Sequence, residues 1–365
     1  MESLVFANVS HRPVRTLVSI LGVSVGVILV LMMTGLVRGM INDRVSRESK
    51  SGAEIIFRQS GSSPFAFNNA MPIPLTVVDQ IRKIDGVAIV SPVGQFIQAS
   101  SSGLGFFTAD GIDYDSYTQI SGMQIISGTP FQSDNDVIID QQYSQSHKVG
   151  PGGTIKILDQ QFRVAGIYAP ENGFRVKLRL SKLQSLLSSG KHCSVIYIKC
   201  AHPEDQEAVA RRISDAFPDN QIIFTRDLPQ LYNDNFSAAS TFLNVIVVVA
   251  VIVSTLTILL AMYTAVTERT REIGILKALG ASNSFIVFLI EKEALVISVA
   301  GIVVGYLISL VARAGIMRSS ILRIEFETHW LLFAFGVALF AGLLGSLYPA
   351  MRAARQDAVV ALAYE

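Results

Sequence analysis

Four stretches of the chain carry no charged side chain over a length that can cross a bilayer. A membrane-spanning helix needs about 20 apolar residues to cross roughly 30 Å of hydrocarbon. The four stretches run from Thr16 to Val37, within Asn235 to Thr267, from Ala294 to Ala312 and from Trp330 to Met351. We therefore predict four transmembrane helices. The first is expected to be a permanent anchor, because its apolar core is too long for a cleavable signal.

The composition agrees with a membrane protein and excludes several other classes. Half of the residues are hydrophobic (50%) and only 16% are charged, which is too apolar for an ordinary soluble domain. A net charge of +1 leaves no basic face for nucleic acid. The histidines lack ligand spacing, so no metal site is expected. Cys193 and Cys200 bracket a predicted strand and lie too far apart for a disulfide.

Basic residues near the predicted spans orient the chain in the membrane. Lysine and arginine favour the cytoplasmic side. They occur before the first span, between the second and third, and after the fourth, at Arg12, Arg15, Arg269, Arg271, Lys277, Lys292, Arg352 and Arg355. Arg313, Arg318 and Arg323 in the loop after the third span oppose this orientation. Three basic flanks against one place both termini in the cytoplasm, with the large domain outside.

The segment between the first two spans has the pattern of a folded domain. At nearly 200 residues it is long enough for one or two hydrophobic cores. Alternating strand and helix patterns predict an α+β fold with open sheets. Residues 91–134 are richer in Ser, Gly and Thr and are expected to form a β-rich subdomain. The stretches "GMINDRVSRESK" and "TRDLPQLYNDNF" could extend the first two spans outward as a stalk.

The predicted fold class is a membrane protein with four transmembrane α-helices and a large α+β extracytoplasmic domain inserted between the first and second. The predicted order is a cytoplasmic segment 1–15, spans at 16–38, 236–267, 285–312 and 330–351, the outer domain 39–235, a cytoplasmic helix 268–284, an outer loop 313–329 and a cytoplasmic tail 352–365.

The run "ERTREIGILKALGAS" (268–282) is charged and amphipathic and lies between two predicted spans. It predicts a short helix from Glu268 to Leu279, stopped by Gly280 at a left-handed C-cap. This helix could lie on the lipid surface. Alternatively, a ridge of Ile273, Leu276 and Leu279 could fill a groove on a cytoplasmic partner. In that case Arg269, Arg271 and Glu272 would fix the register by charge, with Lys277 near the helix end.

Several sequence patterns that carry chemistry are missing from the chain. It has no phosphate-binding loop, because "GPGGT" at 150–154 lacks the lysine that meets phosphates. It also has no nucleophile elbow and no zinc-protease motif. The spans carry almost no ionisable group, which argues against an ion relay, a channel or a secondary transporter. Gly301 and Gly305 form a G-x-x-x-G pattern that allows close helix packing.

Separated stretches resemble one family, the MacB/FtsX/LolC-like permeases of ABC transporters. They are "RTLVSILGVSVGVILVLMMTGLVRG" with Gly22 and Gly26, "ERTREIGILKALGAS" followed by "FLIEKEALVISVAGIVVG", and the C-terminal "YPAMRAARQDAVVALAYE". In the second stretch, Glu293 best matches the family's acidic residue. The tail departs from the family pattern at Ala358, where proline is common, and at Ala363, where a basic residue is common.

The resemblance implies a non-catalytic, multi-pass subunit of the inner (cytoplasmic) membrane that works as a dimer, with a homodimer preferred over a heterodimer. It implies an ABC ATPase partner that carries ATP and Mg, so no cofactor is expected on this chain. Residues 268–280 would be the helix that couples to the ATPase. Whether a periplasmic adaptor and an outer-membrane channel are needed stays open.

Two functions follow from the resemblance. In the first, ATPase motion is transmitted along the first two spans to the outer domain (mechanotransmission), for export or extraction of a substrate. In the second, an FtsX-like regulator transmits the same motion to an extracytoplasmic cell-wall hydrolase. The two-part outer domain and the C-terminal motif favour the first.

Overall fold

The computed structural model describes residues 13–61, 69–99, 106–234 and 237–357. These residues divide into two compact units. The first, here called the helical unit, consists of residues 1–39, 236–317 and 323–365. The second, here called the sheet unit, consists of residues 40–235 and 318–322. The helix α2 (Pro13–Ser49) contributes residues to both units.

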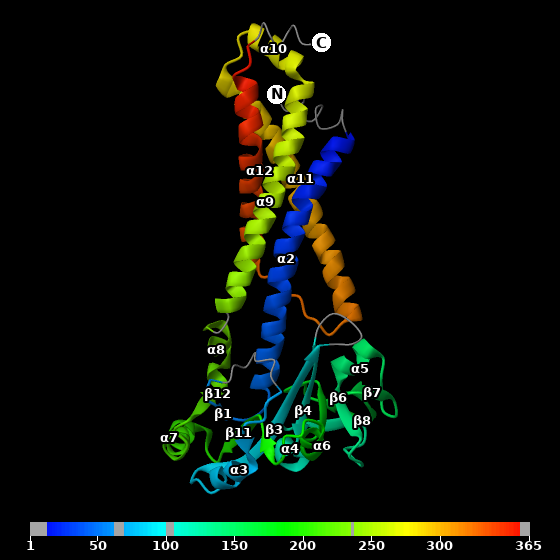
Figure 1. Ribbon diagram of the computed structural model, residues 1–365, viewed down its shortest axis with the longest axis vertical. Coiled ribbons are helices and arrows are strands. Elements are labelled where there is room, and N and C mark those ends of the chain that lie inside the picture. The colour runs from blue at the N-terminus through cyan, green and yellow to red at the C-terminus, as the bar shows by residue number, and fades with distance from the viewer. Residues whose placement is uncertain (1–12, 62–68, 100–105, 235–236, 358–365) are drawn as a thin grey trace. The chain divides into compact units, whose positions relative to one another are not determined.

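Long apolar helices build the helical unit (Figure 1). Besides the first part of α2, they are α9 (Ser237–Glu268), α11 (Asn283–Ser319) and α12 (Thr328–Ala354), with the short α10 (Thr270–Ala278) between α9 and α11. Among the described residues, α2, α9, α11 and α12 are long and apolar enough to cross a membrane. The four-helix prediction is confirmed, and α2 continues as a helix through the predicted extension to Ser49.

Small residues allow these helices to approach one another closely. A Cβ added at Gly22 would lie 2.1 Å from the side chain of Thr257 on α9, and one at Gly26 would lie 2.2 Å from Ser254 Oγ. One at Gly301 would lie 2.6 Å from Val23, and one at Gly305 would lie 3.0 Å from the Ser24 carbonyl oxygen. The structure thus places α9 and α11 against α2 at the glycines singled out in the sequence.

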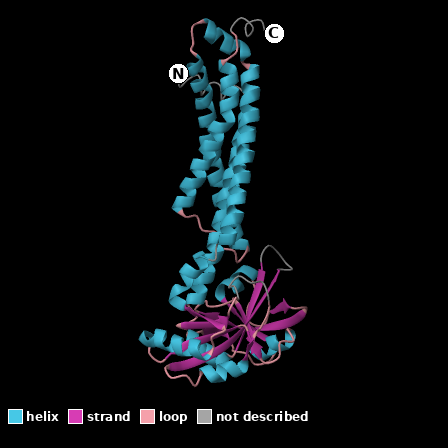
Figure 2. Cartoon of the chain, turned by 60° about the vertical axis from the view of Figure 1, so that its left-hand side comes forward, coloured by secondary structure: helices cyan, strands magenta, loops and turns pink. Residues whose placement is uncertain are grey.

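The strands described in the structure form one ten-stranded sheet and one two-stranded sheet (Figure 2). The large sheet has the order β12-β1-β11-β3-β4-β9-β6-β8-β5, with β7 also paired to β8, and β10 pairs with β2 in the small one. The strands are β1 Ile55–Gln59, β2 Ile73–Pro74, β3 Val87–Ala99, β4 Phe106–Ile112, β5 Gln124–Gly128, β6 Asp136–Asp140, β7 Thr154–Ile157, β8 Gln160–Ala169, β9 Val176–Arg179, β10 His192–Cys193, β11 Val195–Cys200 and β12 Asn220–Phe224.

Short helices accompany the sheet, and hydrophobic clusters among the described residues join two of them to its strands. The helices are α3 Leu75–Ile81, α4 Tyr114–Ser121, α5 Gln141–His147, α6 Leu180–Leu186, α7 Gln206–Ala216 and α8 Leu228–Asp234. One cluster joins β1 and β11 to Val209 and Ile213 of α7. The other joins β6, β8 and β9 to Leu183 of α6. Cys193 and Cys200 are buried free thiols, as predicted, and burial raises the pKa of Cys193 to about 12.

Residues 91–134 do not form a separate subdomain, so this prediction is wrong. β3 pairs with β11 and β4 pairs with β9, which places both strands inside the large sheet. Two glycines in this stretch, Gly94 and Gly111, have a packing reason. A Cβ at Gly94 or Gly111 would lie 3.2 Å or 2.8 Å from the Cδ2 of Leu183. The small residues therefore make room for helix α6.

Replacing Gly301 with alanine tests the close helix packing. We expect Gly301→Ala to destabilise the helical unit by about 1–3 kcal/mol, because the new methyl group overlaps Val23. The measurement is thermal unfolding of the purified full chain in detergent. Gly336→Ala is the matched control, since its Cβ would meet nothing within 4 Å. Equal unfolding midpoints for the two variants would contradict the prediction.

Candidate functional site

The candidate site is α10, the short helix between α9 and α11. Glu268 is the last residue of α9, so the new helix begins at Thr270, two residues after the predicted start. The Thr270 hydroxyl donates to the carbonyl oxygens of Val266 (3.3 Å) and Thr267 (2.9 Å), which bridges the break between α9 and α10. Gly280 has a φ of +94°, the left-handed conformation expected of a residue that ends a helix.

The helix α10 has a buried face and an exposed face. Thr270, Ile273 and Gly274 are buried, and Ile273 belongs to the hydrophobic core of the helical unit. On the other face Ile275 is 45% exposed and Leu279 is 81% exposed. Positions four apart lie on the same side of a helix. The exposed apolar pair is therefore Ile275 and Leu279.

The predicted ridge of Ile273, Leu276 and Leu279 does not form one exposed surface. Ile273 is only 8% exposed, while Leu276 is half-buried. Steps of three residues drift around a helix with 3.6 residues per turn, so this ridge runs from the buried face to the exposed face. The exposed charged side chains of α10 are those of Arg271 and Glu272, and Glu268 at the end of α9 is exposed as well.

An ion pair fastens the start of α10 to α11. Nη1 of Arg269 lies 3.2 Å from Oε2 of Glu293. The Glu293 side chain is 8% exposed and that of Arg269 is 14% exposed, so the two charges are largely withdrawn from solvent. The sequence had singled out both residues, but nothing in it paired them. Arg269 thus faces another helix of its own chain.

The end of α10 is fastened to α12 by Lys277. Nζ of Lys277 donates to the carbonyl oxygens of Ala354 (2.6 Å) and Gln356 (2.7 Å). These carbonyls lie at the C-terminal end of α12, where a helix presents unpaired oxygens and partial negative charge. Arg352 in the last turn of α12 donates to the Tyr263 hydroxyl on α9 at 2.6 Å. No local sequence pattern indicates these contacts, apart from the position of Lys277 in the last turn of its helix.

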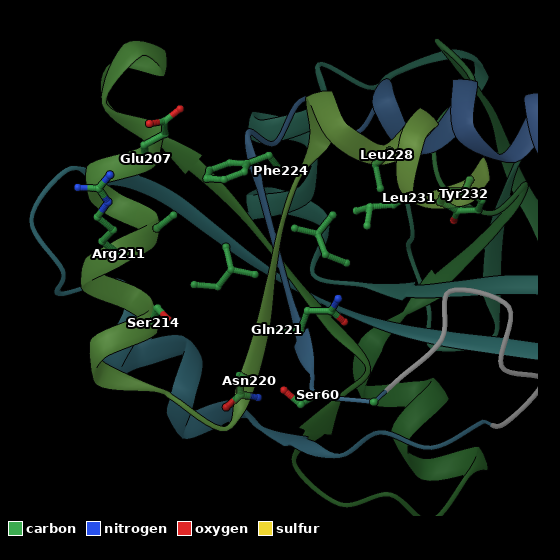
Figure 3. A pocket seen from close by; sticks show the side chains of 14 residues that line it. Ser60, Glu207, Arg211, Ser214, Asn220, Gln221, Phe224, Leu228, Leu231 and Tyr232 are labelled. Carbon is green, nitrogen blue, oxygen red and sulfur yellow. The ribbon is translucent and has the colours of Figure 1, made fainter. Parts of the chain in front are cut away.

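The sheet unit contains an open groove beside its edge strand β12 (Figure 3). The groove measures about 830 Å³ and lies between α7 and α8. Its charged side chains are Glu207, which pairs with Arg226 at 2.7 Å, and Arg211. The remaining lining residues are Ser60, Gly61, Ala210, Ser214, Asn220, Gln221, Ile222, Ile223, Phe224, Leu228, Leu231 and Tyr232. These side chains do not make a nucleophile–base arrangement.

The described residues also contain no group of three or more His, Cys, Asp or Glu that could hold a metal ion. The exposed pair Ile275 and Leu279 thus lies on a helix whose two ends are attached to α11 and α12.

Removing the amine of Lys277 tests its attachment to α12. We expect Lys277→Met to speed amide exchange in α10 and the last turn of α12 about tenfold or more, because hydrogen bonds from a charged donor are lost. The measurement is hydrogen exchange of the full chain followed by mass spectrometry. Arg271→Met, on the exposed face of the same helix, is the control. The assignment fails if both variants exchange like the unaltered chain.

Comparison with known proteins finds relatives along nearly the whole chain. It is 24% identical over 389 residues to the macrolide export ATP-binding/permease protein MacB of Bradyrhizobium diazoefficiens, covering 98% of this chain and 59% of that protein. It is 24% identical to the pyoverdine export ATP-binding/permease protein PvdT of Pseudomonas fluorescens, covering 96% and 57%. An uncharacterized ABC transporter permease of Methanocaldococcus jannaschii is 22% identical, covering 98% and 96%. The chain thus spans about three fifths of the length of the export relatives named here.

Two solved structures show weaker similarity. The periplasmic region of MacB from Actinobacillus actinomycetemcomitans matches with a TM-score of 0.39 and 14% identity, covering 52% of this chain and 96% of that one. The extracellular domain of the noncanonic ABC-type transporter YknZ from Gram-positive bacteria matches with a TM-score of 0.37 and 15% identity, covering 46% and 98%.

Two family models match consecutive parts of the chain. The MacB-like periplasmic core domain matches residues 16–216, and the FtsX-like permease C-terminal region matches residues 244–358. The first model ends shortly before α8 and α9, and the second begins inside α9 and includes α10, α11 and α12. Their order agrees with an outer α+β domain inserted between the first and second spans. This chain therefore belongs to the MacB/FtsX-like ABC transporter permeases.

Proposed function

We propose that this chain is the permease subunit of an ABC transporter in which ATP hydrolysis on a partner ATPase changes the conformation of the outer α+β domain. The work done there is export or extraction of a substrate by mechanotransmission. The observation that carries the proposal is the construction of α10. It presents an apolar pair to the outside while its two ends are attached to α11 and α12.

The exposed face of α10 is suited to a protein groove. Fully burying a leucine or isoleucine side chain contributes about 1.5–3 kcal/mol, so covering Leu279 and Ile275 would supply a substantial part of a stable contact. Arg271 and Glu272 flank these side chains with opposite charges, which can fix the register of the partner. A groove on a partner could contact both the apolar pair and these charges, which is why we favour an ATPase contact over a helix that rests on lipid.

In this proposal the partner ATPase supplies the nucleotide-binding site. The sequence contains no phosphate-binding loop, so ATP and Mg belong to the ATPase in this proposal. A second permease subunit, preferably an identical one, would complete the transporter in the inner membrane. An adaptor and an outer-membrane channel would join only if the route crosses a second membrane.

Export is supported better than regulation of a cell-wall hydrolase. The relatives named for a function export macrolides or pyoverdine, and the match to the MacB-like periplasmic core domain extends over residues 16–216. These two substrates differ in chemistry, so they do not define the molecule that this chain would move. We therefore propose export as the activity, in preference to regulation of a cell-wall hydrolase.

Introducing a charge at Leu279 tests the ATPase contact. We expect Leu279→Asp to weaken binding by about 2 kcal/mol or more, roughly 30-fold in Kd, because a carboxylate would replace an apolar anchor in the groove. The measurement is co-elution of the tagged chain with ABC ATPases of its own organism, followed by titration of the purified chain with the ATPase that co-elutes.

Ser284→Asp is the matched control, because it adds the same charge at an exposed position four residues beyond Gly280. The variant chains should elute as folded protein, since Leu279 is exposed in the chain itself. Unchanged affinity in Leu279→Asp would refute the role of α10 as the ATPase contact.

A further inference from the structure

Charged residues are unusually concentrated and buried at the end of α2 that belongs to the sheet unit. Asp43, Arg44, Arg47 and Glu48 follow one another over less than two helical turns. Arg47 is 9% exposed and Glu48 is fully buried. Charged residues are seldom buried at this level unless they are paired. Each of them has partners in another element of the same unit.

Glu48 joins three elements of the sheet unit. Its carboxylate lies 2.6 Å from Nη2 of Arg58 on β1 and 3.2 Å from Nε of Arg44 on α2 itself. It also accepts a hydrogen bond from the hydroxyl of Tyr232 on α8. Burial and the neighbouring carboxylate raise the pKa of Tyr232, which keeps the phenol in its donating form. The end of α2 is therefore joined to β1 and to the helix that precedes α9 in the chain.

Asp43 joins α2 to the sheet through Arg175. The Nη2 atom of Arg175 donates to both oxygens of Asp43, at 3.0 and 2.9 Å. Its Nη1 atom donates to Oδ2 of Asp140, at the end of β6, at 2.7 Å. One guanidinium thus holds a carboxylate of the helix and a carboxylate of the sheet at once, which a lysine amine could not do with the same geometry.

The loop before Arg175 holds the same helix end. The Gly173 amide donates to the Arg47 carbonyl oxygen at 3.2 Å, and the Arg47 guanidinium donates back to the Gly173 carbonyl oxygen. The Arg44 guanidinium lies over the Phe174 ring, 4.0 Å from its centroid. A main-chain hydrogen bond, a side-chain hydrogen bond and a cation–π contact thus close this loop over the last turns of α2.

Buried groups of the sheet support the loop from its other side. Lys177 donates to the carbonyl oxygens of Asn172 (3.0 Å) and Phe174 (3.1 Å) and to Asp110 (3.2 Å). Asp110 in turn accepts from the Phe174 amide at 2.7 Å. Burial lowers the pKa of Lys177 to about 8. The loop at residues 172–174 is therefore held by the sheet on one side and contacts the end of α2 on the other.

Charge pairs of this kind resist sliding in a way that apolar contacts do not. Breaking a buried pair leaves an uncompensated charge, which is much more costly than shifting one apolar side chain along another. This cluster contains equal numbers of carboxylates and guanidiniums. The carboxylates are those of Asp43, Glu48, Asp140 and Glu171, and the guanidiniums are those of Arg44, Arg47, Arg58 and Arg175. A displacement of α2 alone would break several pairs together.

We propose that this set of contacts is a clasp that makes the outer end of α2 and the sheet move as one body, with Asp43, Glu48 and Arg175 as its positioning residues. The inference rests on the proposed function, since the clasp matters only if α2 carries movement. It names the residues through which that movement would reach the sheet. None of them was singled out by the sequence.

The decisive variant is Asp43→Asn, which removes one charge from α2 and leaves the Arg175–Asp140 pair of the sheet in place. The readouts, on the full chain in lipid nanodiscs, are amide exchange and the distance between spin labels at the exposed positions Ser46 and Gln161. We expect exchange of residues 40–49 to become about tenfold faster or more and the distance distribution to broaden. Strands β6 and β9 should keep their exchange rates.

Asp79→Asn is the matched control. It makes the same chemical change in the exposed pair Asp79–Arg82, whose side chains are 70% and 57% exposed, and should change neither readout. Arg175→Lys provides a second test: it keeps the positive charge but cannot hold both carboxylates, so it should also loosen residues 40–49. If residues 40–49 keep their exchange rates in both clasp variants, or if β6 and β9 loosen equally with them in Asp43→Asn, the clasp is refuted.

The outcome is separable from that of the ATPase contact. Exchange and label distances require neither ATP nor a partner, so they judge the clasp even if the chain binds no ATPase. In the complex, Asp43→Asn should co-elute with the ATPase as the unaltered chain does. Loss of co-elution would overturn the assignment of the clasp as a local link between α2 and the sheet.

Discussion

The structure depends on the continuity of α2, a single helix that contributes to both compact units. This helix runs from Pro13 to Ser49, and the unit boundary falls between Gly39 and Met40. Two different kinds of contact hold it. Glycines of α2 and α11 allow close packing in the helical unit, and buried charges fix the other end in the sheet unit.

The two kinds of contact suit their surroundings. In a bilayer there is little hydrophobic drive between helices, so close approach at Gly26 and Gly301 provides packing where large side chains would prevent it. In the sheet unit, the charges on α2 can be paired with charges on strands and loops. Their net contribution to stability is modest because desolvation opposes pairing, but the penalty for mispairing is large. Charge there provides positional accuracy more than stability.

The helix α10 shows how far local pattern carries a prediction. Its existence, its approximate ends and its stop at Gly280 followed from helix formers and a capping glycine. The sequence did not predict which side chains of α10 are exposed, because in a nine-residue helix this depends on which side the other helices cover. Ile273 looked like part of a docking ridge and is buried. Residues 91–134 were misinterpreted for a related reason, since Gly94 and Gly111 make room for α6 and do not mark a separate fold.

The sequence by itself determined that four helices could span a membrane and that an α+β domain lies between the first two. These are properties of neighbouring residues, which hydrophobic length and periodicity report directly. Only the tertiary structure decided that Arg269 meets Glu293, that Lys277 meets the end of α12, and that Arg175 joins Asp43 to Asp140. Asp43 and Arg175 are far apart in the chain, and their pairing depends on strand order and helix direction, which no local pattern encodes.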